Sequence, residues 1–361
     1  MRPKGRITIR VDANAEIGSG HLSRCTTLGR QLQRDGFAVS IASRPGYHAE
    51  ACAPIPVSWI DIAASAEGEA NTLADSAATL SIAGTAAPGP SCVIVDHYAL
   101  DAAWESAIRD QGHAVMAIDD FRDRRHCADL LVSDSDLPFD RLLNPCVAHC
   151  TELRGARYAI VDSSFVAPSS LDRREAPWSL LVTYGASDPT GETLRAIAAI
   201  ASLQRTSTHA ALLHEIHVVI GPSNARGEAI ELAVAGLRGG IVHRAPRTLA
   251  PVMRDCDLVL TSGGHTLLEA LASERPCLVT QTAANQALSI ARLRGLDAVV
   301  FAGASTGGEA QTLEEGLSEM LASLPRRIAA ARTHRMFDGH GASRISAAIQ
   351  RLMAERQIPP A

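Results

Sequence analysis

The sequence lacks the cysteine patterns that mark metal-binding or disulfide-stapled proteins. Its eight cysteines include no C-x-x-C pair and none of the spacings of a zinc ribbon. Most of them lie in apolar surroundings, such as Cys92 in SCVIVD and Cys277 in RPCLVT. We therefore interpret them as small core residues of a protein in a reducing compartment.

The sequence also lacks an excess of positive charge and a long apolar run. The formal net charge is −5, which argues against general nucleic-acid binding. No stretch approaches the ~20 apolar residues that a membrane span requires, and the N-terminus MRPKGRITIR has no hydrophobic signal core. We expect a cytoplasmic protein with no membrane span and no nucleic-acid partner.

What the sequence does contain is a regular alternation of strand and helix patterns. With 361 residues, of which 46% are hydrophobic, the chain is long enough for two domains with cores of their own. Residues 6–11 alternate with period two, and residues 21–34 repeat apolar side chains at helical spacing. Residues 92–96 form a continuous apolar run, which is typical of a parallel sheet. Further strands are predicted at 37–43, 113–120 and 128–134, with helices in 61–90 and 103–112.

A second series of the same kind follows a polar, proline-bearing segment. Strands are predicted at 179–185, 215–221, 256–264 and 276–281, and helices from about 190, near 227–237, from 265 and at 286–293. We therefore predict an α/β protein of two doubly wound, Rossmann-like domains that face a cleft. The expected divisions are 1–165 for the N-terminal domain, 166–178 for a linker, 179–345 for the C-terminal domain, and 346–361 for a final helix and tail.

The first polar motif is Gly18-Ser19-Gly20-His21, directly after the first strand region. Glycines allow a tight turn, and a helix N-terminus presents free N–H groups to an anion. Taken alone, the motif is also compatible with an exposed or structural histidine in the first turn of a helix. It does not have the G-x-G-x-x-G spacing of a dinucleotide site.

Two further polar segments follow strands of the N-terminal half. Asp96 and Tyr98 can hydrogen-bond a polar ligand, whereas Asp101 is expected to cap the next helix. Asp119 and Asp120 could hold Mg²⁺, and His126 with Cys127 could hold zinc, but the supporting ligand spacing is missing. An Asp–Arg structural network is the favoured interpretation there, and turn chemistry is favoured for Asp134-Ser135-Asp136.

The C-terminal half carries a glycine turn that opens a helix. Ser262, Gly263, Gly264, His265 and Thr266 can surround a diphosphate with N–H and O–H donors. Glu269 lies one turn further along the same helix face, where a carboxylate can accept both hydroxyls of a ribose. Asn285 and Gln286 add amides after the next strand. The alternative is an ordinary glycine turn in front of a buried helix.

These motifs together resemble a known family. The segments RVDANAEIGSGHLSRC, VDHYALD, IDDFRDRRHCADLLV, YGASDPTGET, MRDCDLVLTSGGHTLLEAL, AANQ and DGHGASR occur in this order. They resemble the UDP-sugar hydrolases of the pseudaminic acid pathway, which are similar in fold to the glycosyltransferase that makes lipid II. The resemblance extends from residue 6 to about residue 345.

The resemblance implies a GT-B fold, with UDP on the C-terminal domain and the sugar towards the N-terminal one. His21 matches the proposed catalytic base. Tyr98 matches the D-x-Y tyrosine of the family, and we expect further sugar and phosphate contacts from Asp12, Gly18, Gly20, Arg24 and Asp96. The implied UDP contacts are Ser262, Gly263, Gly264, His265, Thr266, Glu269, Asn285 and Gln286. No cofactor and no metal are expected, and we expect a monomer.

Two positions depart from the family pattern. His265 stands where a small residue is more common, and residues 155–165 match only loosely, with Val161-Asp162 in place of Leu-Arg. The implied substrate is a UDP-linked 2,4-diacetamido-2,4,6-trideoxy hexose, which water attacks at the anomeric carbon with inversion. A histidine suits the deprotonation of that water, and Asp12 or another carboxylate could orient its ring. The alternatives are a glycosyltransferase that uses a UDP-sugar donor and a non-catalytic nucleotide-sugar binding protein.

Overall fold

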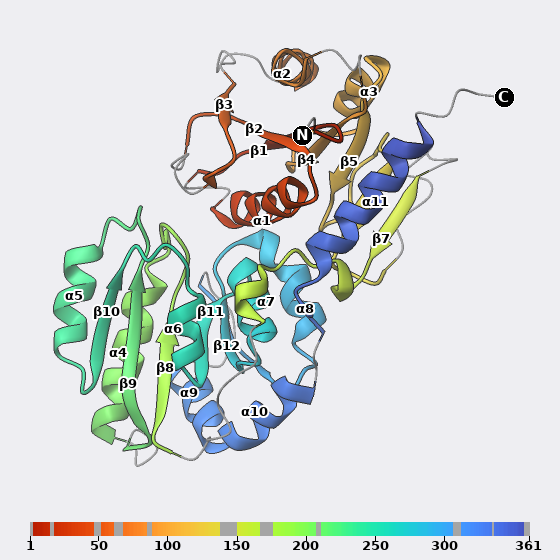
Figure 1. Cartoon of the computed structure of the whole chain (residues 1–361). Helices are drawn as coiled ribbons and strands as arrows, with labels where there is room; N and C mark the ends of the chain where they lie inside the picture. Colours follow the sequence, from red (N-terminus) through yellow and green to blue (C-terminus); the bar gives the residue numbers. More distant parts are fainter. Residues whose placement is uncertain are drawn as a thin grey trace. The chain divides into compact units, whose positions relative to one another are not determined.

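The computed structural model describes residues 3–14, 18–46, 52–60, 68–84, 89–137, 150–166, 176–206, 211–305, 312–333 and 336–356. The chain divides into two compact units, which are described separately. Unit 1 comprises Met1–Val161 together with Gly339–Ala361, and unit 2 comprises Asp162–Asp338. Figure 1 shows the elements of both units in the colours of the sequence.

Unit 1 is built on a parallel sheet in the order β3-β2-β1-β4-β5-β6-β7. The order reverses at β1, because the chain first adds strands on one side of β1 and then on the other. This is the topology of a doubly wound domain, in which ligands bind at the carboxyl ends of the strands next to the reversal. The strands are β1 (Arg6–Val11), β2 (Ala38–Ser43), β3 (Val57–Trp59), β4 (Ser91–Asp96), β5 (Ala114–Ile118), β6 (Leu130–Ser133) and β7 (Thr151–Arg154).

Helices cover both faces of this sheet because both faces of its central strands are apolar. In β4, Cys92 and Ile94 join the core that contains Leu28 of α1. The intervening Val93 and Val95 join the opposite core, which contains Trp104. The helices of unit 1 are α1 (Gly20–Arg34), α2 (Gly68–Ala83), α3 (Ala102–Asp110) and α11 (Gly341–Glu355), with the 3-10 turn η3 (Ala156–Tyr158).

Unit 2 repeats the plan with a parallel sheet in the order β10-β9-β8-β11-β12-β13. Its strands are β8 (Trp178–Val182), β9 (Leu213–Ile220), β10 (Gly240–Arg244), β11 (Leu258–Ser262), β12 (Cys277–Gln281) and β13 (Val299–Ala304). Its helices are α4 (Glu192–Thr206), α5 (Gly227–Ala235), α6 (Ala250–Asp255), α7 (His265–Ala272), α8 (Ala287–Leu293), α9 (Leu313–Ala322) and α10 (Leu324–Thr333). Two 3-10 turns are η4 (Ser163–Phe165) and η6 (Ala284–Gln286).

The last helix belongs to unit 1, although residues up to 345 were expected to lie in the C-terminal domain. α11 packs beside α1 and η3 (Figure 1). Ile345, Ile349 and Met353 enter the core beneath α1. Gly341 starts the helix where the carbonyl of Ala159 would lie only 2.0 Å from an added Cβ. The periodicity of α11 predicts a helix, but it does not say which core receives it.

The first unit ends at Val161, close to the expected 165. Most of the expected linker, residues 167–175, lies outside the described residues, and Trp178 already belongs to β8. The strands β3, β7, β10 and β13 and the helices α6, α9 and α10 had no prediction, although Leu313, Leu317, Met320 and Leu321 of α9 recur at helical spacing.

Candidate active site

The first group of site residues lies at the carboxyl ends of β1 and β4. These strands are neighbours, and Val11 is paired with Asp96. The connections that follow them leave towards opposite sides of the sheet, because β2 lies beyond β1 and β5 lies beyond β4. The connection after β1 leads into α1 at Gly20, which brings His21 to the end of β4.

His21 and Asp96 form a buried hydrogen-bonded pair. The Nδ1 atom of His21 lies 2.6 Å from Oδ1 of Asp96, and the residues are 7% and 1% exposed. Burial opposes ionisation of the Asp96 carboxyl, but Arg24 and His21 outweigh it and hold its pKa well below the usual range. Asp96 is therefore a carboxylate, and His21 must donate the hydrogen of Nδ1. This tautomer leaves the lone pair of His21 Nε2 available to accept a proton.

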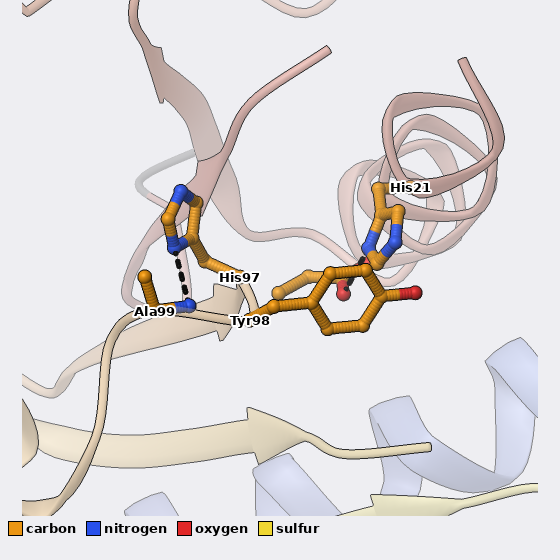
Figure 2. A pocket seen from close by; sticks show the side chains of 5 residues that line it. His21, His97, Tyr98 and Ala99 are labelled. Carbon is orange, nitrogen blue, oxygen red and sulfur yellow. Dashed lines mark hydrogen bonds and ion pairs between the residues drawn. The ribbon is translucent and has the colours of Figure 1, made fainter. Parts of the chain in front are cut away.

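Tyr98 and Ala99 complete a pocket around this pair, together with Asp96, His97 and His21 (Figure 2). The Tyr98 ring meets His21 edge to face at 4.6 Å between centroids. On its other side it contacts Phe121 at 4.8 Å. The imidazole thus lies against an aromatic wall, which limits the orientations that its ring can adopt.

His97 supports the turn that carries Tyr98. Its Nδ1 accepts the backbone N–H of Ala99 at 3.1 Å, as Figure 2 shows. Its Nε2 lies 3.2 Å from the carboxylate of Asp12. Asp12 in turn accepts the backbone N–H of Arg44 at 2.8 Å and is bound by the buried Arg10. The carboxylate that orients His21 is consequently Asp96 and not Asp12, and Asp12 anchors the wall of the pocket.

Arg24 lies one helical turn after His21 and contacts two carboxylates. Its Nε and Nη2 atoms bind the two oxygens of Asp96 at 2.6 Å each. Its Nη1 atom binds Asp120, at the end of β5, at 2.8 and 3.1 Å. Arg24 is thus part of the hydrogen-bonded framework around His21.

The two glycines before His21 shape the start of α1. Gly18 has φ +83°, and its N–H bonds the carbonyl of Asn14 at 2.8 Å. Gly20 is the first residue of the helix, and the side chain of Ser19 makes no capping bond. The turn therefore ends at a helix N-terminus, next to His21, that its own N-cap residue Ser19 does not cap. Residues 15–17 of this loop lie outside the described part of the chain.

The acidic residues after β5 form a structural network, as the sequence favoured. Asp119 accepts bonds from Arg124 at 3.1 Å and from the fully buried His126 at 2.8 Å. The other ring nitrogen of His126 lies 2.7 Å from Glu105. Asp101 caps α3 by accepting the N–H of Ala103. In the described ranges, no set of three or more His, Cys, Asp or Glu side chains has the arrangement of a metal site.

The His126 network should make folding stability fall in mildly alkaline solution. Burial lowers the pKa of His126, but Asp119 and Glu105 outweigh it and raise the pKa from 6.5 to about 9. A histidine whose pKa is higher in the folded state than in the unfolded state contributes its full stabilisation at pH values below the unfolded-state pKa. This contribution is lost as the pH rises through the folded-state pKa. The shift corresponds to about 3 kcal/mol. We expect the free energy of unfolding in urea to fall by up to that amount between pH 6.5 and 9.5.

A His126→Gln variant provides the control for this effect. It should be less stable than the parent at pH 6, and it should lack the decline that His126 causes. Subtracting the two pH profiles removes the contribution of groups that titrate in both proteins. A difference between parent and variant that stays constant from pH 6 to 9.5 would contradict the assignment of a charged His126.

The second group of site residues lies in unit 2 at the start of α7. The loop Ser262–Gly264 follows β11, a central strand between β8 and β12. Gly264 is the N-cap residue of α7 and, as a glycine, offers no side-chain capping bond at this end. The helix after the neighbouring strand β8 differs, because Asp188 accepts the N–H groups of Glu192 and Thr193 at 2.8 and 3.0 Å. Between these two helices, α7 is therefore the one whose start lacks a carboxylate of the kind that Asp188 gives to α4, and a helix N-terminus of this type suits an anion.

The two glycines of this loop have different surroundings. A Cβ at Gly263 would lie 2.5 Å from Ile290, so packing requires a glycine there. A Cβ at Gly264 would meet its nearest atom, Ser262 Oγ, at 3.7 Å, which is ordinary contact. Gln286 accepts the N–H of Gly263 at 3.3 Å and that of Thr282 at 2.9 Å. Gln286 thus fixes the loop, while the space beside Gly264 remains open.

Glu269 and His265 lie on one face of α7. The imidazole Nε2 of His265 is 3.7 Å from Oε1 of Glu269. Burial, and then the charge of Asp162, raises the pKa of Glu269 from 4.5 to about 7, while a bond from Thr266 opposes the rise. Asp162 comes from the loosely matching segment 155–165, where it caps η4. Nearby in the chain, the buried Oδ1 of Asn285 has no hydrogen-bond partner among the described residues.

Comparison with solved structures identifies the architecture. Acinetobacter baumannii MurG matches with a TM-score of 0.65 and 14% identity over 97% of this chain and 100% of that chain. A glycosyltransferase from Rickettsia africae matches at 0.62 and 14% over 98% and 99%. Arabidopsis thaliana UGT89C1, complexed with UDP-L-rhamnose, matches at 0.63 and 13% over 99% and 100%. The chain has the GT-B fold. Neither the protein-family models nor the curated proteins give a match to the sequence.

The GT-B fold confirms the predicted pair of Rossmann-like domains with parallel sheets. At these identities the similarity concerns the fold, so the chemistry has to be argued from the residues of this chain. No helix in the described ranges is both long and apolar enough to cross a membrane.

Several residues described above were not among the predicted site residues, including His97 and Ala99, which line the pocket. Asp120 contacts Arg24, and Asp188 closes the N-terminus of α4. For Asp120 the signal was present, since it follows the strand next to β4, and neighbouring parallel strands end at the same edge of a sheet. For Asp188 the signal was its position four residues before Glu192, where its carboxylate caps the first turn.

Proposed function

We propose that this protein hydrolyses a UDP-sugar to the free sugar and UDP. In this proposal unit 2 binds the UDP moiety, and His21 of unit 1 deprotonates the water that attacks the anomeric carbon. The observation that carries the catalytic part is the hydrogen bond between His21 and Asp96. It directs the hydrogen of Nδ1 to Asp96, so that in the neutral ring Nε2 is the nitrogen with a free lone pair, as a general base requires.

The chemistry of the leaving group fits the residues of unit 2. UDP needs stabilisation of its developing negative charge more than it needs a proton. The N-terminus of α7, with the hydroxyls of Ser262 and Thr266, offers preorganised donors for that charge. Glu269 offers a carboxylate to the ribose hydroxyls, and the unpartnered oxygen of Asn285 offers an acceptor. Attack of water from the face opposite to UDP would invert the anomeric centre.

The sequence resemblance supports hydrolysis and a specific sugar. It covers both the Gly-x-Gly-His element and the Gly-Gly-x-Thr element, and it implies a 2,4-diacetamido-2,4,6-trideoxy hexose. Each acetamido group carries one donor and one acceptor. A site built for two of them leaves polar groups unpaired when plain UDP-glucose binds, so it should reject that substrate.

Incubation of the pure protein with UDP-sugars in water, without an acceptor, tests this proposal. We expect release of UDP from the diacetamido sugar, no measurable release from UDP-glucose, and unchanged activity in EDTA. In ¹⁸O-water the label should appear in the sugar, because attack occurs at carbon. The anomer first released should be inverted when it is followed by NMR.

Other outcomes would replace the proposal. Release of UDP only after an acceptor is added would make the protein a glycosyltransferase. Binding without release would make it a nucleotide-sugar binding protein. Label in the UDP phosphate would exclude attack at carbon, and loss of activity in EDTA with rescue by Mg²⁺ would show a metal requirement.

The two loop glycines offer a matched test of the UDP site. Gly264→Ala should leave stability nearly unchanged, because the added methyl fits and the backbone φ of −87° is ordinary. It should nevertheless weaken UDP binding at least ~10-fold, because the methyl occupies the space beside the first N–H groups of α7. Calorimetric titration with UDP and thermal unfolding provide the measurements.

Gly263→Ala is the control for this substitution. Its methyl would collide with Ile290, so this variant should be destabilised by roughly 1–3 kcal/mol through overpacking. Unchanged UDP affinity in a stable Gly264→Ala variant would remove this loop from the nucleotide site.

A further inference from the structure

The guanidinium of Arg24 is occupied by protein carboxylates at all three nitrogens. Nε and Nη2 bind Asp96 side by side, and Nη1 binds Asp120. The side chain of Arg24 is 15% exposed, and that of Asp96 is 1% exposed. A bidentate pair of this kind has a fixed geometry and little freedom to turn towards a ligand.

Asp96 is shared between a cation and the imidazole. Its Oδ1 accepts from Nδ1 of His21 and from Nη2 of Arg24, both at 2.6 Å. The two nitrogens lie 3.3 Å apart. Because Asp96 is ionised, Nδ1 of His21 carries a hydrogen, so the short contact brings a positive guanidinium against an N–H group. A second proton on His21 would place two cations side by side on one carboxylate.

Among the charged groups around His21, Arg24 is the cation that opposes protonation of the imidazole. Among the described residues, the titratable and charged groups here are Arg24 and Cys25 from α1, Asp96 from β4, His97 and Tyr98 from the following turn, Asp120 from the end of β5, and Asp134, whose charge acts on Asp120. Burial and the Asp96 charge raise the pKa of Cys25, so its thiol is neutral. The two carboxylates favour an imidazolium, and Arg24 counters them.

We propose that Arg24 is a positioning residue that keeps His21 in its neutral, Nδ1-protonated form by neutralising Asp96, and that it does not bind the substrate. This inference rests on the proposed role of His21 as the base. An isolated histidine–carboxylate pair would hold its second proton to higher pH, so a smaller fraction of it would be unprotonated and able to act as a base at neutral pH. With Arg24 on the same carboxylate, Asp96 orients the ring without strongly favouring its charged form.

Variants of Arg24 that differ in charge test the proposal through the pH profile of kcat. Arg24→Gln removes the cation but retains a hydrogen-bond donor. Its acidic limb should move to higher pH by about one unit or more, with ~10-fold lower activity at pH 6.5 and recovery near pH 9. Arg24→Lys retains the charge, so its profile should stay near that of the parent even if kcat falls.

The proton affinity of His21 can also be read without turnover. In protein labelled with ¹³C-histidine, the His21 resonance is assigned by its absence in His21→Gln. In Arg24→Gln this ring should gain its second proton at higher pH than in the parent. The NMR titration applies even to a protein that hydrolyses nothing, so failure of this inference and failure of the proposed hydrolase activity can be distinguished.

Three results would overturn the inference. A ring titration unchanged in Arg24→Gln shows that the cation does not control His21. An unchanged pH profile with weaker UDP-sugar binding shows that Arg24 binds substrate. If Arg24→Gln does not fold, Asp120→Asn provides a second test, in which the expected shift of the His21 titration has the opposite direction. It frees Arg24 from its second carboxylate and should move the ring titration to lower pH, and a shift to higher pH or none overturns the proposal.

Discussion

His21→Ala should lose most turnover, with kcat lower by about 10²–10⁴-fold, while UDP affinity stays within a few-fold of the parent. The imidazole is expected to activate water, and the predicted nucleotide contacts belong to unit 2. Removing it should therefore affect the chemical step and not the binding of UDP. Single-turnover kinetics with the UDP-sugar and calorimetry with UDP measure the two effects separately.

His214→Ala is a suitable control for this variant. His214 is the second residue of β9, at the amino end of that strand, and its side chain is 55% exposed. It should behave like the parent in both assays. If His21→Ala keeps kcat within a few-fold of the parent, His21 is not the base.

Glu269→Gln should stabilise the protein and weaken UDP binding at the same time. The folded pKa of Glu269, about 7, exceeds the ordinary value of 4.5, so its ionisation costs stability as pH rises through that range. At pH 8 the cost amounts to about 3 kcal/mol, and below pH 4.5 it vanishes. The amide avoids this cost, so the variant should gain stability at pH 8 and little at pH 4.5.

The same substitution should lower UDP affinity by about 10-fold or more. A carboxylate can accept both ribose hydroxyls, whereas an amide offers only one acceptor oxygen. Urea unfolding at both pH values and calorimetry with UDP provide the readouts, and the exposed Glu228 gives a control variant, Glu228→Gln. A Glu269→Gln protein that is stabilised but binds UDP normally would remove Glu269 from the nucleotide site. A destabilised variant would contradict the raised pKa.

A gain in stability in Glu269→Gln would also indicate that the buried carboxyl group of Glu269 serves function and not the stability of the fold. A residue that only supported the fold would not be expected to destabilise it, and strongly perturbed carboxylates concentrate at functional sites. Asp162, which contributes to the perturbation, comes from the segment 155–165 where this chain departs from the family pattern. The difference from the family pattern in this segment therefore changes the surroundings of Glu269, the residue that is expected to bind the ribose hydroxyls.

The sequence by itself determined the alternation of strands and helices and the positions of the polar loops. The apolar run of β4 and the helical spacing of α1 are local patterns, and each is set by which faces of an element are buried. The same locality explains why His21 and the Ser262–Gly264 loop could be recognised at once. Both lie where a glycine turn enters a helix, and a turn of this kind is encoded within a few residues.

Only the tertiary structure decided which side chains act together. Asp96, 75 residues after His21, orients its ring, whereas Asp12, much closer in the chain, holds His97 and Arg10 instead. Likewise Arg24 pairs with Asp120, and α11 packs on the first unit rather than the second. These partners are chosen by the order of strands in a sheet and by the shape of a core. Both depend on contacts across the whole chain, which no local pattern of residues contains.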